Sequence, residues 1–125
     1  MYLIDTNIFL EILLNDSNRN KCEKFLNDNI SLLFISDFSL HSIGIILFKK
    51  NKPGLYQKFI QDIISHITIV TLDLSNFECL WNGRITYNFD FDDAFQYCVA
   101  KHQGLTLITQ DEDFKNVTDI KIEYL

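Results

Sequence analysis

The chain has 125 residues, 47% of them hydrophobic, and a formal net charge of −6 at pH 7. This length suits one domain over residues 1–125, and the apolar content excludes a chain that is disordered throughout. The negative charge argues against a protein that coats nucleic acid, because phosphate contacts come from Lys and Arg. It does not exclude an enzyme that places a cation between its own carboxylates and a phosphate.

The sequence contains no signal for a membrane or for secretion. No apolar run approaches the roughly 18 residues of a membrane span, and the N-terminus reaches a charge at Asp5 without the basic start of a signal peptide. We therefore expect a cytoplasmic protein. Its cysteines, Cys22, Cys79 and Cys98, are odd in number and far apart. We expect reduced, mostly buried thiols, not a disulfide framework or a zinc site.

The first half of the chain alternates short apolar runs with helical patterns. Residues 2–4 predict a buried strand, followed by a helix that is capped by Thr6 or Asn7 and stops near residues 15–16. Residues 20–29 have the pattern of a surface helix, and residues 32–35 predict a second strand. Ser36 or Asp37 then caps a long helix to about Lys49, whose basic end we expect to be solvated.

The second half repeats this alternation after the break at Pro53-Gly54. One helical face is predicted from the spacing of Leu55, Phe59, Ile60, Ile63 and Ile64. Strands are predicted at residues 67–72, 105–109 and 120–125. Helices are predicted from Asp73 or Ser75 to about residue 82, and over residues 92–103 with Gly104 as the C-cap.

Short apolar strands that alternate with helices predict an α/β fold of three layers. The central sheet has four or five mostly parallel strands, and helices cover both of its faces. In such sheets ligands bind beyond the carboxyl ends of the strands. Polar residues that follow the strands are therefore the candidates for a functional site.

Three acids fall at this predicted edge. Asp5 follows the first strand, Asp111 follows the fourth, and Asp93 lies in the first turn of the helix that leads into the fourth. Carboxylates a few ångströms apart repel, so one pKa must rise or a cation must join them. Oxygen ligands of this kind suit Mg²⁺ or Mn²⁺, which can polarise a phosphoryl oxygen and activate water.

A purely structural interpretation competes for each acid. Asp is a good N-cap, and Asp93 and Asp111 both stand at predicted helix starts. For Asp5 the functional interpretation is favoured, because a charge that ends a buried strand is costly without a partner. Asp90 and Asp92 have the positions of a cap or of solvent-facing residues, and Asp92 becomes a candidate ligand if the helix is phased differently.

The motifs around these acids resemble those of a known family. Leu3-Ile4-Asp5-Thr6-Asn7 is similar to the opening of PIN domains, and Asp93-Ala94, the run 105–109 and Asp111-Glu112-Asp113-Phe114 are similar to their C-terminal half. The step from Asp93 to Asp111 resembles that of VapC-type toxins. The resemblance implies a metal-dependent ribonuclease with Mg²⁺ or Mn²⁺ on Asp5, Asp93, Asp111 and the more variable Asp113, and with Asn7 and Thr109 orienting them. It also implies a homodimer and an antitoxin protein that silences it.

One position departs from the family pattern. PIN domains usually carry a Glu about six residues after the Ser that ends the second strand, and this chain has Ser42 there. Ser cannot offer a full negative charge to a cation. Asp37 or His41, one helical turn apart, are candidate substitutes, although His prefers softer metals than Mg²⁺ and is more often a hydrogen-bonded partner. The alternative is a weakened site.

Three functions are compatible with these residues. The first is a metal-dependent endoribonuclease of the toxin type, in which Asp5, Asp93 and Asp111 are catalytic and Thr6 orients Asp5 or contacts a phosphate. The second is a PIN-like module with little catalysis that binds RNA or a protein partner. The third, a phosphatase or receiver domain, is disfavoured because Asp5-Thr6-Asn7 lacks the D-x-D of such phosphatases and the acidic pair of receivers is missing.

Overall fold

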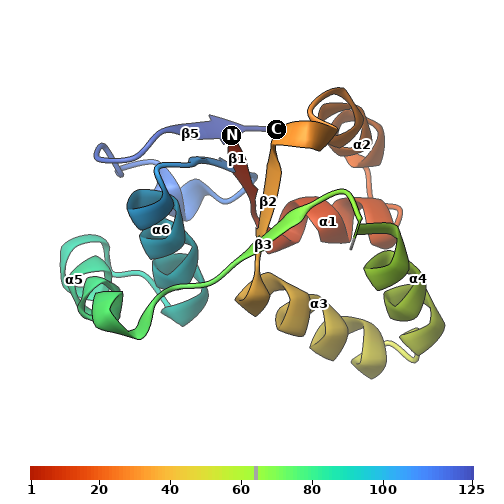
Figure 1. Ribbon diagram of the computed structural model, residues 1–125, viewed down its shortest axis with the longest axis horizontal. Coiled ribbons are helices and arrows are strands. Elements are labelled where there is room, and N and C mark those ends of the chain that lie inside the picture. Colours follow the sequence, from red (N-terminus) through yellow and green to blue (C-terminus); the bar gives the residue numbers. More distant parts are fainter. Residues whose placement is uncertain (64) are drawn as a thin grey trace.

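The computed structural model describes residues 1–63 and 65–125. Figure 1 labels its helices and, where there is room, its strands. The strands are β1 (Tyr2–Ile4), β2 (Leu33–Ser36), β3 (Thr68–Val70), β4 (Thr106–Thr109) and β5 (Ile122–Tyr124). The helices are α1 (Thr6–Leu13), α2 (Arg19–Asp28), α3 (Asp37–Lys49), α4 (Pro53–Ile63), α5 (Glu78–Tyr87) and α6 (Phe91–Gln103), with short 3-10 turns η1 (Ile30–Leu32), η2 (Leu74–Asn76) and η3 (Glu112–Phe114).

The strands form one sheet of five in the order β3-β2-β1-β4-β5, with every neighbouring pair parallel. This confirms the predicted α/β class and the higher of the two predicted strand numbers. The third and fifth strands are shorter than the predicted runs at 67–72 and 120–125. The described strands also run in one direction only, so their carboxyl ends share an edge.

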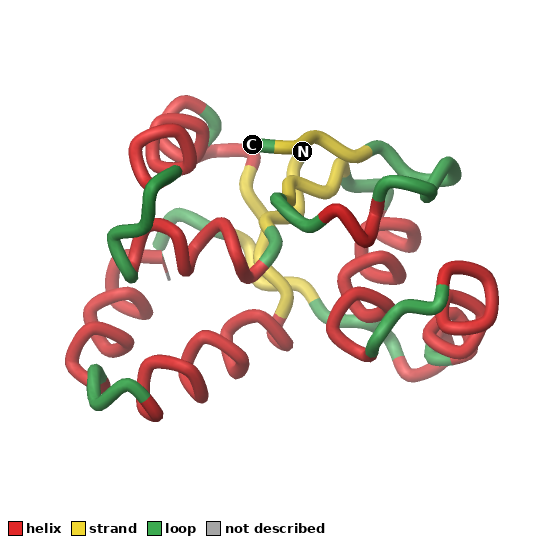
Figure 2. The backbone as a smooth tube through the Cα atoms, turned by 180° about the vertical axis from the view of Figure 1, so that it is seen from behind, coloured by secondary structure: helices red, strands yellow, loops and turns green. Residues whose placement is uncertain are grey.

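Helices cover both faces of the sheet, as the alternation of side chains along each strand requires. Leu3 of β1 and Leu107 of β4 pack with α6 in one core cluster. Their neighbours Ile4 and Ile108 point to the other face, where they pack with α1, α2, α3 and α4. Figures 1 and 2 show this arrangement, with the strands between the α5–α6 pair and the other four helices.

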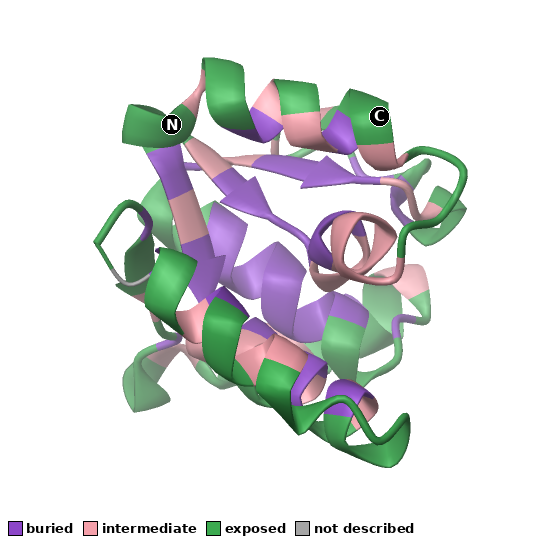
Figure 3. Cartoon of the chain, turned by 90° about the vertical axis from the view of Figure 1, so that its right-hand side faces the viewer, coloured by how far each residue is buried: buried purple, intermediate pink, exposed green. Residues whose placement is uncertain are grey.

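Burial follows the same three layers. Buried segments run through the centre of the fold, and the outward faces of the surrounding helices are exposed (Figure 3). Lys49 and Lys50 at the end of α3 are exposed, which agrees with the expected solvated helix end. Among the described residues, no helix is long and apolar enough to cross a bilayer.

The caps of three helices bear on the acids, and one of these caps differs from prediction. Asp5, not Thr6 or Asn7, is the N-cap of α1, and its side chain accepts a hydrogen bond from the Thr6 amide. Ser36 caps α3, as predicted. Asp90 caps α6, which begins at Phe91, and accepts from the amide of Asp93. A carboxylate or hydroxyl at this position satisfies an amide that the helix leaves unpaired.

Two predicted segments are only partly confirmed. The helix predicted from Asp73 or Ser75 is divided into η2 and α5, and α5 continues to Tyr87 before Asn88 ends it in the left-handed conformation. The face predicted on α4 includes the buried Phe59 and Ile63. Ile64, predicted on that same face, lies outside the described residues.

The prediction of three reduced thiols was wrong for two of them. Cys79 of α5 and Cys98 of α6 form a disulfide with their Cα atoms 5.9 Å apart, a normal spacing for such a bond. Cys22 is free and buried, as predicted. The spacing of 19 residues carries no signal for this pairing, because it depends on how α5 packs along α6.

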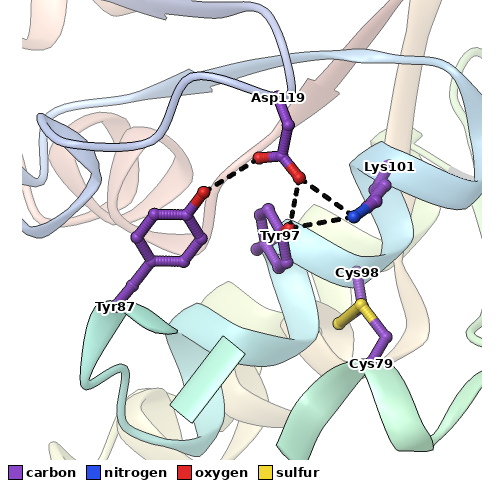
Figure 4. A network of polar contacts seen from close by, with 6 residues as sticks. All are labelled: Cys79, Tyr87, Tyr97, Cys98, Lys101 and Asp119. Atoms are coloured by element: carbon purple, nitrogen blue, oxygen red, sulfur yellow. Dashed lines mark hydrogen bonds and ion pairs between the residues drawn. A yellow bond between two sulfur atoms is a disulfide. The ribbon is translucent and has the colours of Figure 1, made fainter. Parts of the chain in front are cut away.

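Polar contacts add to the disulfide on the same side of the molecule (Figure 4). Asp119, in the loop before β5, accepts hydrogen bonds from Tyr97 at 2.6 Å and from Lys101 at 2.9 Å, both on α6. Tyr87 at the end of α5 donates to its other oxygen at 3.2 Å. This network joins α5, α6 and the chain before β5, so it fixes the helix that carries Asp93.

Candidate metal centre at the carboxyl edge of the sheet

The order of the strands creates a crevice between β1 and β4. From β1 the chain adds β2 and β3 on one side and later β4 and β5 on the other, so the direction of winding changes between β1 and β4. Loops that leave the two strands at such a point diverge to opposite faces of the sheet and leave space for a ligand. Asp5 follows β1 directly, and Thr109 ends β4 two residues before Asp111.

Asp5 is buried at this point and is held by three donors. The residue is 7% exposed. The Thr6 amide donates to Oδ1 at 2.7 Å, Gln96 Nε2 donates to the same oxygen at 3.3 Å, and Thr109 Oγ1 donates to Oδ2 at 2.7 Å. Burial raises the pKa of Asp5, the three hydrogen bonds lower it, and the charge of Asp111 raises it further.

Three acids from the second half of the chain meet beside it. Asp93, Asp111 and Asp113 each offer a carboxylate oxygen, and these oxygens lie within 4.8 Å of one another. Asp93 is buried, and its pKa is raised to about 8, mainly by burial and then by the charges of Asp111, Asp90, Asp5 and Asp113. Asp111 is fixed by its own chain, because its side chain accepts from the amide of Asp113 at 2.9 Å.

The cleft at this edge measures about 210 Å³. Its lining includes most of the residues predicted from the sequence, namely Asp5, Thr6, Asn7, Ser42, Asp93 and Asp111, together with Asp92. Thr109 lies beneath, where it donates to Asp5 and accepts from the Asp111 amide at 3.0 Å. The interpretation of these acids as helix caps is correct for Asp111, which caps η3, but not for Asp93, which lies inside α6.

The sequence matches the PIN domain family over residues 2–120. The chain belongs to the PIN domain family. Among curated proteins, none matches it by sequence. Solved structures of low sequence identity share this PIN fold over nearly their whole length.

Three solved structures illustrate the likeness. The chain from the VapBC2 complex of Rickettsia felis, bound to a promoter DNA fragment, is 17% identical with a TM-score of 0.83 over 98% of this chain and 97% of that one. The chain from DNA-bound VapBC of Salmonella typhimurium is 19% identical, with a TM-score of 0.82 over 98% and 96%. VapC20 of Mycobacterium tuberculosis, described as a toxin that cleaves the sarcin-ricin loop, is 12% identical, with a TM-score of 0.82 over 98% and 99%.

The position at which this PIN domain departs from the family pattern, Ser42, lies in the cleft. Ser42 lines the cleft from α3, whereas neither candidate substitute does. Asp37 accepts hydrogen bonds from the Phe38 amide at 2.9 Å and from Thr71 Oγ1 at 2.9 Å. His41 is exposed and places Nδ1 2.6 Å from the Asp37 carbonyl oxygen. Both side chains therefore have structural partners elsewhere.

Two residues of this PIN domain site were not predicted from the sequence. Gln96 lines the cleft from α6, and its Nε2 donates to Ser39 Oγ at 2.6 Å as well as to Asp5. Ser39 Oγ also lies 2.8 Å from Thr6 Oγ1. The only available signal was the position of Gln96, three residues after Asp93 and therefore on the same helical face.

The chemistry of the cleft fits a hard divalent cation. Its charged groups are carboxylates, the ligands that Mg²⁺ and Mn²⁺ prefer. Among the described residues, the two buried side-chain atoms without a hydrogen-bond partner are the amide oxygens of Asn7 and Gln96, and both residues line this cleft. Acceptors without donors beside crowded carboxylates are what a hydrated cation would satisfy.

Proposed function

We propose that this PIN domain is a metal-dependent endoribonuclease of the toxin type that uses Mg²⁺ or Mn²⁺. The observation that carries the proposal is the convergence of Asp93, Asp111 and Asp113, with oxygens within 4.8 Å of one another, on the edge where Asp5 is buried. So much negative charge repels a phosphate as long as nothing positive lies between them. A bound divalent cation supplies that charge and lowers the pKa of water enough for hydrolysis.

The side chains around the cleft would orient the acids and bind the cation. Three donors keep Asp5 in one orientation. Thr109 donates to Oδ2, and the Thr6 amide and Gln96 donate to Oδ1. Asp93, Asp111 and Asp113 would supply further oxygens. Thr109 orients Asp5 and the backbone of Asp111, and Asn7 would assist from the same cleft. Because the cleft of about 210 Å³ is smaller than a typical small-molecule pocket, it suits an ion with one phosphate better than a whole nucleotide.

Cleavage of a mixed RNA pool tests this function. We expect cleavage with Mn²⁺, none with EDTA, and a loss of at least about 100-fold in Asp5→Asn, because that change removes a charge but keeps the size of the side chain. Asp62→Asn, an exposed acid on α4, is the matched control. Cleavage that persists both with EDTA and in Asp5→Asn would contradict the proposal.

The alternative is a weakened PIN module that binds RNA or a protein partner without efficient cleavage. Ser42 favours it, because this residue lines the cleft where the family usually supplies a Glu. Ser42→Glu separates the two. A large gain in Mn²⁺ affinity and in RNA cleavage would mean that the natural site is weakened. An unchanged rate in a chain that already cleaves RNA would favour the first proposal.

The partners proposed for this chain are RNA, an antitoxin protein and a second copy of itself. Support for the antitoxin comes from similar folds found in VapBC complexes, including those of Rickettsia felis and Salmonella typhimurium. Exposed apolar side chains on α5, among them Trp81 and Ile85, favour contact with another protein surface. Light scattering on the isolated chain tests the dimer, and a monomeric mass at micromolar concentration would contradict it.

A further inference from the structure

Gln96 is a buried amide in the wall of the carboxylate cleft. It lies on α6, three residues after Asp93, and is 1% exposed. Its Nε2 donates to Asp5 Oδ1 at 3.3 Å and to Ser39 Oγ at 2.6 Å. The amide therefore connects the acid after β1 with the first turn of α3.

The neighbours of Gln96 decide which way its amide faces. A carboxylate only accepts hydrogen bonds, so the amide nitrogen must face Asp5 and the amide oxygen must point away from it. Within residues 1–63 and 65–125 this oxygen has no donor. A buried acceptor without a donor costs about 1–3 kcal/mol, so a folded chain retains one only where something else compensates.

We propose that Gln96 is a positioning residue of the metal centre. Its amide nitrogen holds Asp5 in place, and its amide oxygen accepts a hydrogen bond from water in the hydration shell of the cation. The inference rests on the proposed function, because it requires that the cleft binds a divalent cation. Mg²⁺ and Mn²⁺ keep several waters when few carboxylates bind them, so a neutral acceptor beside them has a donor to meet.

This role also relates to Ser42. Ser42 and Gln96 both line the cleft, from α3 and α6 respectively. Because α3 contributes no carboxylate to the lining of the cleft, the oxygen of Gln96 on α6 offers the hydration shell an acceptor there. A second amide oxygen without a donor, that of Asn7, lies in the same lining, so the cleft contains two such acceptors among the described residues.

Calorimetric titration with Mn²⁺ tests the proposal, with urea unfolding in EDTA as the second readout. Gln96→Met keeps the length of the side chain and removes both functions of the amide. We expect its Mn²⁺ dissociation constant to rise by about 10- to 100-fold, the usual effect of losing a group that orients metal ligands. Its metal-free stability should stay close to that of the wild type, because removal of the unpaired acceptor offsets the loss of the hydrogen bonds to Asp5 and Ser39. Gln103→Met, at the exposed end of α6, should change neither quantity.

A second variant tests the amide oxygen separately. Gln96→Glu keeps an acceptor in the cleft, loses the donor to Asp5 and adds a negative charge, so the decisive result is a failure to bind Mn²⁺ more tightly than Gln96→Met. It should bind Mn²⁺ at least about 10-fold more tightly than Gln96→Met, since orienting groups of this kind change metal affinity by about that much. If the two variants bind equally weakly, the role assigned to the amide oxygen is wrong.

The outcomes separate this inference from the proposed function. If the wild type binds no Mn²⁺, the metal-dependent nuclease itself is contradicted. If the wild type binds Mn²⁺ and Gln96→Met binds it within about twofold, the nuclease stands and the inference fails, since a lost orienting group should cost more than that. A loss of metal-free stability with unchanged Mn²⁺ affinity would likewise overturn it, because that is the signature of a purely structural amide.

Discussion

Thr109 Oγ1 donates a hydrogen bond to Asp5 Oδ2 at 2.7 Å across 104 positions of sequence. Thr109 Oγ1 also accepts a hydrogen bond from the amide of Asp111 at 3.0 Å. One hydroxyl at the end of β4 thus fixes the acid that follows β1 and the backbone of the acid that follows β4. Thr109 lies next to the crevice between β1 and β4, where the strand order reverses. The same side chain therefore belongs to the sheet and positions the acids of the cleft.

Thr109→Val removes this hydroxyl and keeps the shape of the side chain. The change leaves the Asp111 amide and one oxygen of Asp5 without a partner, so the free energy of unfolding should fall by about 1–3 kcal/mol. Urea denaturation measures it. Thr106→Val, the same substitution at the other end of β4, should change it by less than about 0.5 kcal/mol. Equal effects at both positions would contradict the role assigned to Thr109.

Stability without metal should depend on pH through Asp93. Its pKa is about 8 in the folded chain against 3.8 for an ordinary Asp, so between these values the folded state binds a proton that the unfolded state has released. Stability in EDTA therefore decreases as pH rises from about 5 to 8, by up to about 1.4 kcal/mol per pH unit for one proton. The raised pKa of Asp5 acts in the same direction.

Asp93→Asn should flatten this dependence and should exceed the wild type in metal-free stability at about pH 8, because burial and neighbouring charges no longer disfavour an ionised group. Urea denaturation in EDTA at several pH values across this range measures it. Asp62→Asn on the exposed face of α4 should keep the wild-type profile. A wild type that becomes more stable from about pH 5 to pH 8 in EDTA would disprove the assignment.

The Cys79–Cys98 disulfide should be visible in solution by counting thiols. Denatured, unreduced protein should react with one equivalent of a thiol reagent, at Cys22, and with three after reduction. Because the crosslink constrains the unfolded chain, its reduction should lower the free energy of unfolding by about 3 kcal/mol. Three reactive thiols before reduction would show that the bond is absent, and Cys22→Ser should leave the effect of reduction unchanged.

Two glycines inside helices should respond oppositely to alanine. A Cβ on Gly44 of α3 would lie 2.9 Å from Tyr56 Cζ, on a ring whose hydroxyl donates to the Leu40 carbonyl at 2.7 Å. Gly44→Ala should therefore destabilise the chain by about 1–3 kcal/mol. At Gly83 of α5 the nearest atom is 3.4 Å away, an ordinary contact. Gly83→Ala should stabilise it by about 0.5–1 kcal/mol, and thermal denaturation compares the pair.

Much of the fold was predictable because short periodic patterns carry it. The run before Asp5 and the run before Gln110 are short and mostly apolar, so they predict strands that are buried on both faces of a parallel sheet and end at the same edge. The boundaries of the helices were harder. Asp5, not Thr6 or Asn7, caps α1, because its carboxylate precedes the helix and reaches a free amide of the first turn. Asp90, one of the candidate caps, does the same for α6.

The sequence by itself determined which acids stand at the carboxyl ends of strands, because strand order along the chain and a common strand direction suffice to bring Asp5 and Asp111 to one edge. Only the tertiary structure decided how they are held. The partners of Asp5, the orientation of Gln96 and the pairing of Cys79 with Cys98 depend on how α6 packs against α3, α5 and the sheet. No local pattern encodes such packing, since it arises from contacts between side chains that lie far apart in the sequence.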